Sequence, residues 1–450
     1  MSRAEGGDAT VENPHSGPHV IHDVLGIGFG PSNLALAIAV EEHNAQLPRD
    51  QRLNARFLER QPRFGWHRGM LIDDATMQVS FLKDLVTMRN PTSDFSFLCY
   101  LRERGRLVDF LNQKTLFPLR VEFHDYFEWA AARVGHLVDY SSEVLSVETV
   151  RDEDGEISHL DVTCRDADDP TRTVVHRARN ISVAVGLEPH LPPGTELSER
   201  VWHNSQLIPR VAEVLASGAP VRRVVVLGAG QSAAEAVDYL HRSFPEAEIC
   251  AVFAKYGYTP ADDSPFANRI FDPEAVDVYF RAPSEVKQSL VDYHRSTNYS
   301  VVDMDLIEAL YATAYREKVQ GRERLRFLNV SRIRQVDVLD ERLGVTVEFL
   351  PTGERETLDA DLLVHATGYR SQDIGTLLGD SSKYCLRDDG DAVRVGRDHR
   401  VEVAPEVTAG IYLQGGTEHT HGLTSTLLST TAIRAGEIHD SLIARRGLVH

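Results

Sequence analysis

The sequence has few cysteines, no long apolar run and no basic, apolar leader. Its four cysteines are far apart, at Cys99, Cys164, Cys250 and Cys385, and they form no C-x-x-C pair. This spacing argues against a zinc motif or dithiol exchange and fits a reducing compartment. No apolar run approaches the roughly 18 residues needed to span a bilayer. We therefore expect a cytoplasmic protein without a membrane segment, with a flexible polar tail at residues 1–19.

Positive charge is also scarce, because 48 basic residues stand against 67 acidic ones and the formal net charge is −19. Nucleic-acid backbones attract cationic surfaces, so a nucleic-acid partner is not expected. Apolar residues make up 42% of the chain and charged residues 26%, the balance of an ordinary globular protein. The length of 450 residues predicts two or three domains.

Residues 23–40 read DVLGIGFGPSNLALAIAV, in which a short apolar strand runs into Gly26-x-Gly28 and then into a helix of small residues. Such a turn lets a pyrophosphate approach the backbone and face the N-terminus of the helix. Pro31 stands where a third glycine is usual. Proline is tolerated in the first turn of a helix, because its missing N–H would have no partner there. The stretch therefore predicts a dinucleotide-binding turn.

A second turn of this kind, Gly228-x-Gly230-x-x-Ala233, also lies between an apolar strand and a helix. Two such turns indicate two Rossmann-like α/β units. Glu59 ends the strand that follows the first turn, and its carboxylate suits the ribose hydroxyls of FAD. The second unit has no acid at the equivalent place, and Lys255 there favours the 2′-phosphate of NADPH. Lys255 as an ordinary surface lysine is the alternative.

Two further patterns have competing interpretations. Lys83 lies in the apolar stretch MQVSFLKDLVTM, where it either awaits a carboxylate ligand or reaches solvent or pairs with Asp84. The stretch TEHTHG places Glu418, His419 and His421 close together. No further His, Asp or Glu accompanies them at a helical spacing, so we predict no metal site.

Seven motifs follow one another between about residues 22 and 445: WHRGM, MQVSFLKDL, GAGQSAAE, DDSPFANRIFDP, NYSVVD, HATGY and GGTEHTHGLTSTLLS. Together they resemble the flavin-dependent N-hydroxylating monooxygenases of siderophore biosynthesis, and within that family most of all the L-ornithine N5-monooxygenases. One departure is Ala254, which stands where relatives can carry an arginine for the NADPH phosphate.

The resemblance implies an α/β fold with two Rossmann-like dinucleotide-binding domains and a small helical substrate domain. It places the FAD domain at 20–200 and 365–450, the NADPH domain at 201–264 and 325–364, and the substrate segment at 265–324. It also implies a homotetramer.

Carried over residue by residue, the family's motifs imply three sets of contacts. Those to FAD are made by Gly26, Gly28, Gly30, Pro31, Ser32, Glu59, Trp66, His67, Gln78, Val144, Thr426, Leu427 and Leu428. Those to NADPH are made by Gly228, Ala229, Gly230, Gln231, Ser232, Lys255, Asn298, Tyr299 and Ser300. Those to the substrate are made by Lys83, Asn268, Arg269, Ile270, Phe271, Asn298 and Ser429.

The implied reaction is hydroxylation of the side-chain amine of L-ornithine by O2 through a flavin C4a-hydroperoxide, which gives N5-hydroxyornithine for a siderophore or related product. No side chain is an obligatory catalyst. Asn298 lies at the amine, and Met77 resembles a residue that shifts beside the flavin between redox states. The alternatives are the same chemistry on L-lysine or a diamine, and an NADPH oxidase or sensor that binds both cofactors without transferring oxygen.

The amine must be neutral to react, although a free alkylamine has a pKa of ~10.4. A neighbouring carboxylate would keep it protonated, whereas the neutral amides of Asn268 and Asn298 would not. Lys83 would bind the substrate carboxylate, and its charge also disfavours protonation of the amine.

Overall fold

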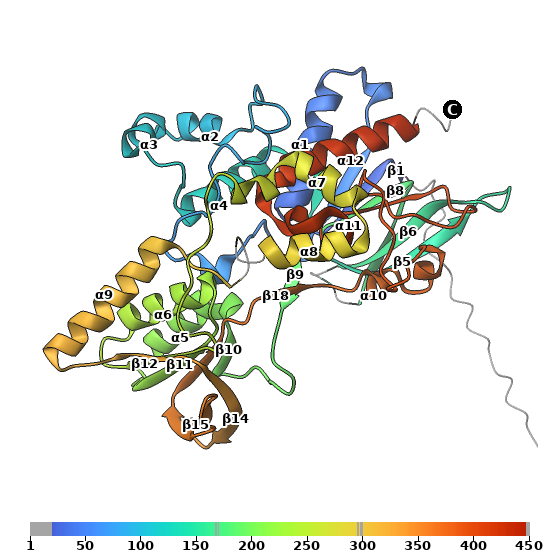
Figure 1. Cartoon of the computed structure of the whole chain (residues 1–450). Coiled ribbons are helices and arrows are strands. Elements are labelled where there is room, and N and C mark those ends of the chain that lie inside the picture. The colour runs from blue at the N-terminus through green and yellow to red at the C-terminus, as the bar shows by residue number, and fades with distance from the viewer. Residues whose placement is uncertain (1–19, 167–168, 170, 295–296, 298–299, 447–450) are drawn as a thin grey trace, which may run out of the picture.

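The protein folds around two five-stranded parallel sheets, each flanked by helices (Figure 1). A computed structural model describes residues 20–166, 169, 171–294, 297 and 300–446. The first sheet has the order β19-β8-β2-β3-β4, with bounds Gly410–Leu413, Asn180–Val183, Val24–Ile27, Ala55–Leu58 and Val138–Asp139. The second has the order β10-β17-β11-β12-β13, with bounds Val201–His203, Leu362–His365, Arg223–Leu227, Glu248–Val252 and Leu325–Leu328. Two such sheets agree with the predicted Rossmann-like units.

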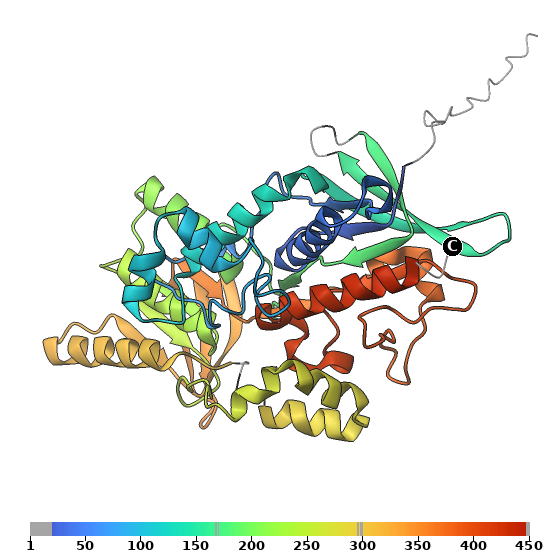
Figure 2. The same cartoon turned by 90° about the horizontal axis from the view of Figure 1, so that it is seen from above.

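Segments near the two ends of the described chain build the first unit together. Strand β2 is buried at all four residues, because helices cover the faces of its sheet. Helix α1 (Pro31–Ala45) follows the first glycine turn and packs along α12 (Thr431–Arg446), as both views show (Figures 1 and 2). The side chains of residues 34–40 on α1 are buried in this core, which explains the run of small and apolar residues there.

An aromatic cluster attaches three helices to the first unit: α2 (Phe97–Glu103), α3 (Leu107–Gln113) and α4 (Arg120–Arg133). At its centre the ring of Phe97 lies 5.3 Å from that of Phe123 and 5.5 Å from that of Phe110. A four-stranded sheet of order β1-β7-β6-β5 extends the unit, with bounds Ile21–His22, Thr173–Ala178, Ile157–Asp166 and Ser142–Arg151.

The chain passes between the units at an antiparallel pair of short strands, β9 (Leu187–Pro189) and β18 (Tyr369–Ser371). The second unit covers its sheet with α5 (Leu207–Ser217) and α6 (Gln231–Ser243). It also carries a three-stranded antiparallel sheet of β14 (Ser331–Leu339), β15 (Arg342–Phe349) and β16 (Arg355–Ala360). None of the helices in the described part of the chain has the length and apolar character needed to cross a bilayer.

The helices of the predicted substrate segment, residues 265–324, contact both units. Helices α7 (Pro273–Arg281) and α8 (Ser284–His294) lie against α11 (Glu418–His421) and the 3-10 helix η8 (Gly422–Thr426) of the first unit. Helix α9 (Met304–Gln320) instead packs on α6 of the second unit, where it forms the crossover between β12 and β13 (Figure 1).

The packing of α9 explains this division. Leu310 is buried in the core beneath the second sheet, and Leu306 packs against the same core. Tyr311, at the next position, is 75% exposed. Helix α9 therefore buries its apolar face against the second unit.

A buried ion pair joins the two units. Arg120 begins α4 of the first unit, and its guanidinium donates two hydrogen bonds to Glu235 on α6, at 2.9 and 2.6 Å. The two side chains are 12% and 7% exposed. Arg120 also donates to the carbonyl of Met70 at 2.9 Å. Since two parallel hydrogen bonds fix both distance and orientation, this pair determines how α6 faces the first unit.

Removing one partner of this pair should destabilise the protein strongly. We expect Glu235→Leu to lower the free energy of unfolding by about 3–5 kcal/mol, because Arg120 would stay buried without its counter-ion. Denaturant-induced unfolding followed by circular dichroism measures the change. The control is Arg242→Gln, which removes ion pairs with Asp74 and Asp238 in which the Arg242 side chain is 48% exposed and which should cost less than about 1 kcal/mol. Equal losses in the two variants would contradict the expectation.

Candidate active site

At Gly26 and Gly28 the first glycine turn packs too closely against the rest of the protein to admit a side chain. Gly28 has a φ of +80°, and a Cβ there would lie 2.5 Å from the carbonyl oxygen of Ala184. A Cβ on Gly26 would lie 2.1 Å from the ring of Phe57. Gly30, just before α1, differs, since apart from its own chain neighbours no atom of the described residues lies within 4 Å of its would-be Cβ. The backbone therefore leaves an open space at the N-terminus of α1, which fits a pyrophosphate.

Glu59 lies at the carboxyl end of β3, beside this turn. Its carboxylate is buried and accepts hydrogen bonds from the backbone N–H groups of Phe29 at 2.7 Å and Gln61 at 2.8 Å. A carboxylate offers about four acceptor positions, so it can still accept the hydroxyls of a ribose. The geometry thus suits the adenosine half of FAD.

The second turn is built in the same way. Gly228 has a φ of +149°, and a Cβ there would lie 2.3 Å from the carbonyl oxygen of Ala366 and 3.0 Å from the Cβ of Ala233. The small third residue of the motif is thus required by close packing. The turn opens at the N-terminus of α6, which begins at Gln231 and Ser232. These residues form a second place for a pyrophosphate, as NADPH requires.

Lys255 lies beside this second turn. Its ammonium donates to the carbonyl of Ser300 at 2.5 Å and to the hydroxyl of Thr259 at 3.3 Å, and burial lowers its pKa. Ser300 in turn lies 3.4 Å from the would-be Cβ of Gly230. Lys255 is therefore held near the turn and is not a freely solvated lysine. Asn298 and Tyr299, predicted NADPH contacts, lie outside the described residues.

The predicted flavin-side residues of the first unit lie close to the boundary with the second. His67 has a φ of +50° and is exposed in the described chain. Met77 is buried, and Gln78 donates a hydrogen bond to Asp303 at the start of α9. The other members of this predicted set are Trp66, partly buried in the aromatic core, and Val144, partly buried on β5.

The segment of residues 426–429 contains the last predicted FAD contacts, Thr426, Leu427 and Leu428, and the substrate residue Ser429. The hydroxyl of Ser429 is buried and has no hydrogen-bond partner among the described residues. A buried hydroxyl without a partner is unfavourable, so this site fits a polar ligand.

Arg434 supports this segment from α12. Its buried guanidinium donates to the carbonyl of Ser425 at 2.6 Å and to the hydroxyl of Ser32 at 3.2 Å. It thereby joins the first turn of α1 to the segment that precedes Ser429. No sequence signal marked Arg434, because an arginine in a terminal helix is ordinarily solvated.

Lys83 is half-buried, and its ammonium forms no hydrogen bond or ion pair within the described residues. Asp84 does not neutralise it, so the pairing alternative is wrong. The buried Asp84 carboxylate instead accepts three backbone N–H groups, those of Val86 at 3.0 Å, Thr87 at 2.7 Å and Phe97 at 2.8 Å. Lys83 thus remains available for an anionic group.

The predicted substrate residues 268–271 form the 3-10 helix η5 (Ala267–Phe271). Asn268 donates its amide N–H to the carbonyl of Asp263 at 2.8 Å. Arg269 is 71% exposed and pairs with Asp272. Ile270 lines an apolar cavity together with Tyr279 and Leu423, while Phe271 is half-buried.

The histidines of TEHTHG serve the fold. His419 hydrogen-bonds to the carbonyl of Val393 at 2.8 Å. His421 stacks on His399 with ring centroids 4.1 Å apart, and burial followed by the nearby His399 lowers its pKa to about 3. Among the described residues, no group of three His, Cys, Asp or Glu side chains is arranged to hold a metal ion.

Comparison with known proteins agrees with this geometry. Residues 20–371 match the family described as L-lysine 6-monooxygenase/L-ornithine 5-monooxygenase. The chain belongs to this family of monooxygenases. It is 42% identical to an L-ornithine N(5)-monooxygenase of Burkholderia cepacia, over 89% of this chain and 90% of the relative.

Solved structures of the family also resemble this monooxygenase. The ornithine N-hydroxylase of Kutzneria sp. 744, solved with reduced FAD, NADP+ and L-ornithine, shares 45% identity and a TM-score of 0.89, with 95% of this chain and 100% of that chain covered. The L-lysine 6-monooxygenase of Pseudomonas syringae shares 30% identity and a TM-score of 0.82, with 94% and 99% covered.

The two glycines of the first turn give a matched test of FAD binding in this monooxygenase. A methyl group on Gly30 meets only open space in the protein, so we expect Gly30→Ala to keep the stability of the FAD-free chain. It should weaken FAD binding by about tenfold or more, since the methyl would stand where the pyrophosphate approaches. Fluorescence titration of the FAD-free protein measures the affinity.

Gly28→Ala is the contrasting variant. Its positive φ and its close approach to Ala184 should destabilise the chain even without FAD. Thermal unfolding of the two FAD-free variants separates the effects. Wild-type FAD affinity in Gly30→Ala would show that the pyrophosphate binds elsewhere.

Proposed function

We propose that the protein hydroxylates the side-chain amine of L-ornithine, using FAD, NADPH and O2, to give N5-hydroxyornithine. The observation that carries the proposal is the unpaired Lys83 ammonium, which lies six residues after Met77 on the predicted flavin-side segment. Membership of the lysine/ornithine monooxygenase family supports the reaction class. The relatives at 42% and 45% identity are named for ornithine, and this supports ornithine as the substrate.

FAD, when reduced by NADPH, supplies the electrophilic oxygen by activating O2, so the protein's own contribution is binding and orientation. Lys83 binds the α-carboxylate of ornithine and sets the distance at which the side-chain amine lies. The amide of Asn268 is uncharged and does not hold the amine in its protonated form. The buried side chain of Met77 and the apolar cavity beside Ile270 help to exclude water.

The alternative substrates differ in where their charges lie. A diamine has no carboxylate for Lys83, so the free cation favours an amino acid. L-lysine has the carboxylate but places its amine one methylene farther away. The lysine enzyme of Pseudomonas syringae is less similar to this chain, at 30% identity, than the ornithine enzymes. An NADPH oxidase without oxygen transfer would need no such cation.

We further propose a cytoplasmic homotetramer that makes its product for a siderophore or a related natural product. This proposal rests on the resemblance of the motifs. An exposed apolar stripe on α9 supports self-association, since Tyr311, Tyr315 and Val319 are 75%, 64% and 69% exposed at helical spacing.

The reaction can be tested directly with the purified FAD-bound protein. We expect NADPH oxidation in the presence of L-ornithine to yield hydroxylamine product nearly in proportion, with less product from L-lysine and least from putrescine. NADPH consumption and a colorimetric hydroxylamine assay are measured in the same reactions. Oxidation of NADPH with no product from any of the three amines would instead favour the oxidase.

Removal of the Lys83 charge should affect ornithine and spare NADPH. We expect Lys83→Ala to raise the KM for ornithine roughly 10- to 100-fold, because one charge-assisted hydrogen bond to the substrate is lost. Flavin reduction by NADPH should stay near the wild-type rate. Steady-state and stopped-flow kinetics measure the two quantities. Lys318→Ala, an exposed lysine on α9, is the control. An unchanged KM in Lys83→Ala would remove the assigned role.

A further inference from the structure

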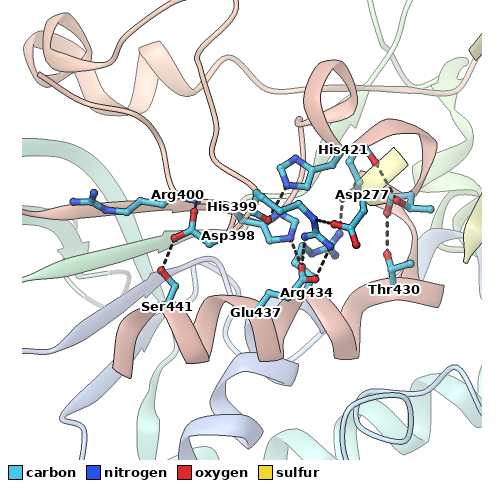
Figure 3. Close-up of polar contacts among 12 residues, drawn as sticks. Asp277, Asp398, His399, Arg400, His421, Thr430, Arg434, Glu437 and Ser441 are labelled. Carbon is cyan, nitrogen blue, oxygen red and sulfur yellow. Dashed lines mark hydrogen bonds and ion pairs between the residues drawn. The ribbon is translucent and has the colours of Figure 1, made fainter. Parts of the chain in front are cut away.

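A cluster of polar side chains lies between α7 and α12 (Figure 3). Arg397 stands at its centre. Its Nε donates to Asp277 on α7 at 2.6 Å, and its two terminal nitrogens donate to Glu437 on α12 at 2.8 Å each. One guanidinium therefore connects the helical segment to the first unit.

The α12 side of this connection is rigid. Glu437 also accepts a hydrogen bond from His399 at 2.9 Å. Burial alone would raise the pKa of Glu437, but the hydrogen bonds from His399 and Arg397 lower it to about 2. The carboxylate is thus charged at neutral pH and holds Arg397 in a fixed orientation, with the Nε edge turned to Asp277.

Aromatic rings of α7 also contact the first unit. The ring of Tyr279 lies over Gly422, where a Cβ would approach it to 3.2 Å, and the ring of Phe280 lies 5.7 Å from that of His421. Such contacts hold α7 against η8 without fixing its position along the surface, because apolar packing is not directional. The ion pair with Arg397 supplies the direction that they lack.

The position of α7 determines that of η5. Helix α7 starts at Pro273, two residues after the end of η5, so the two move together. On the opposite side, Glu437 lies three residues after Arg434, which holds Ser425 and Ser32. Helix α12 therefore supports both the predicted flavin-contacting segment and, through Arg397, the predicted substrate segment.

We propose that Arg397 and Asp277 are positioning residues that seat η5 against the flavin-contacting segment and thereby set the affinity for the amino-acid substrate. This inference rests on the proposed function. The Arg397 side chain is 29% exposed and that of Asp277 45%, and ion pairs as exposed as this contribute little to global stability. Loss of the pair should therefore appear in substrate binding more than in folding.

Asp277→Asn in the FAD-bound enzyme tests the proposal. We expect the KM for ornithine to rise about tenfold, since a small displacement of a binding segment is costly. Flavin reduction by NADPH and FAD content should stay at wild-type values. Amide hydrogen exchange of residues 267–281, measured without ornithine, should become faster, which reports on the segment independently of activity.

Two matched variants complete the experiment. Glu274→Gln removes an exposed carboxylate from the same helix and should leave both the KM and the exchange unchanged, whereas Asp277→Glu should restore much of the lost affinity. The proposal is overturned by a wild-type KM and wild-type exchange in Asp277→Asn, by an equal effect of Glu274→Gln, or by loss of FAD with global destabilisation. If the wild-type protein formed no N5-hydroxyornithine, the proposed function would fail, while the exchange data would still decide whether Asp277 seats η5.

Discussion

The ion pair between Arg120 and Glu235 is the contact on which the relation between the two units depends. Each glycine turn lies at the carboxyl end of its own parallel sheet, so neither sheet alone can bring a nicotinamide to a flavin. The ion pair contacts residues near both predicted cofactor sites. Arg120 holds the carbonyl of Met70, in the stretch that leads to Met77, while Glu235 accepts from Gln231 at 3.0 Å, at the start of the second turn's helix. Because both charges are buried, the two units cannot shift without leaving one of them uncompensated.

The substrate segment follows from the same division. Its first two helices pack on the first unit and α9 packs on the second, so the segment contacts both units. Asp303 illustrates this, since its backbone N–H donates to Gln231 while its carboxylate accepts from Gln78. A site that draws residues from both units is formed only when they are correctly oriented.

The sequence predicted those features that are enforced locally. The two glycine turns follow from the strand–turn–helix pattern and from the positive φ of Gly28 and Gly228, although the carbonyls that crowd them belong to the remote residues Ala184 and Ala366. Glu59 follows from its place at the end of β3. Features that depend on distant partners were not predictable. Arg120, Arg397 and Arg434 find their acceptors on segments remote in the sequence, and nothing in their neighbours distinguishes them from surface arginines. Lys83 is an intermediate case. The sequence marks it as unusual, but only the structure shows that Asp84 accepts three backbone N–H groups and does not pair with it. A helical periodicity predicts a buried face but not the surface that buries it, so the different packing partners of α7 and α9 are known only from the structure.

The electrostatic setting of the site also depends on these pairings. In a chain with 67 acidic residues, a carboxylate beside the substrate amine would be a common accident, and it would hold that amine in its unreactive protonated form. Three acids of this region are engaged by hydrogen bonds instead. Asp84 is bound by backbone N–H groups, Glu235 by Arg120, and Asp277 by Arg397. Burial raises the pKa of Asp303, which reduces its tendency to carry charge. Lys83 has no such partner among the described residues, as the proposed binding of a substrate carboxylate requires. The two ion pairs thus connect segments and also neutralise the carboxylates of Glu235 and Asp277.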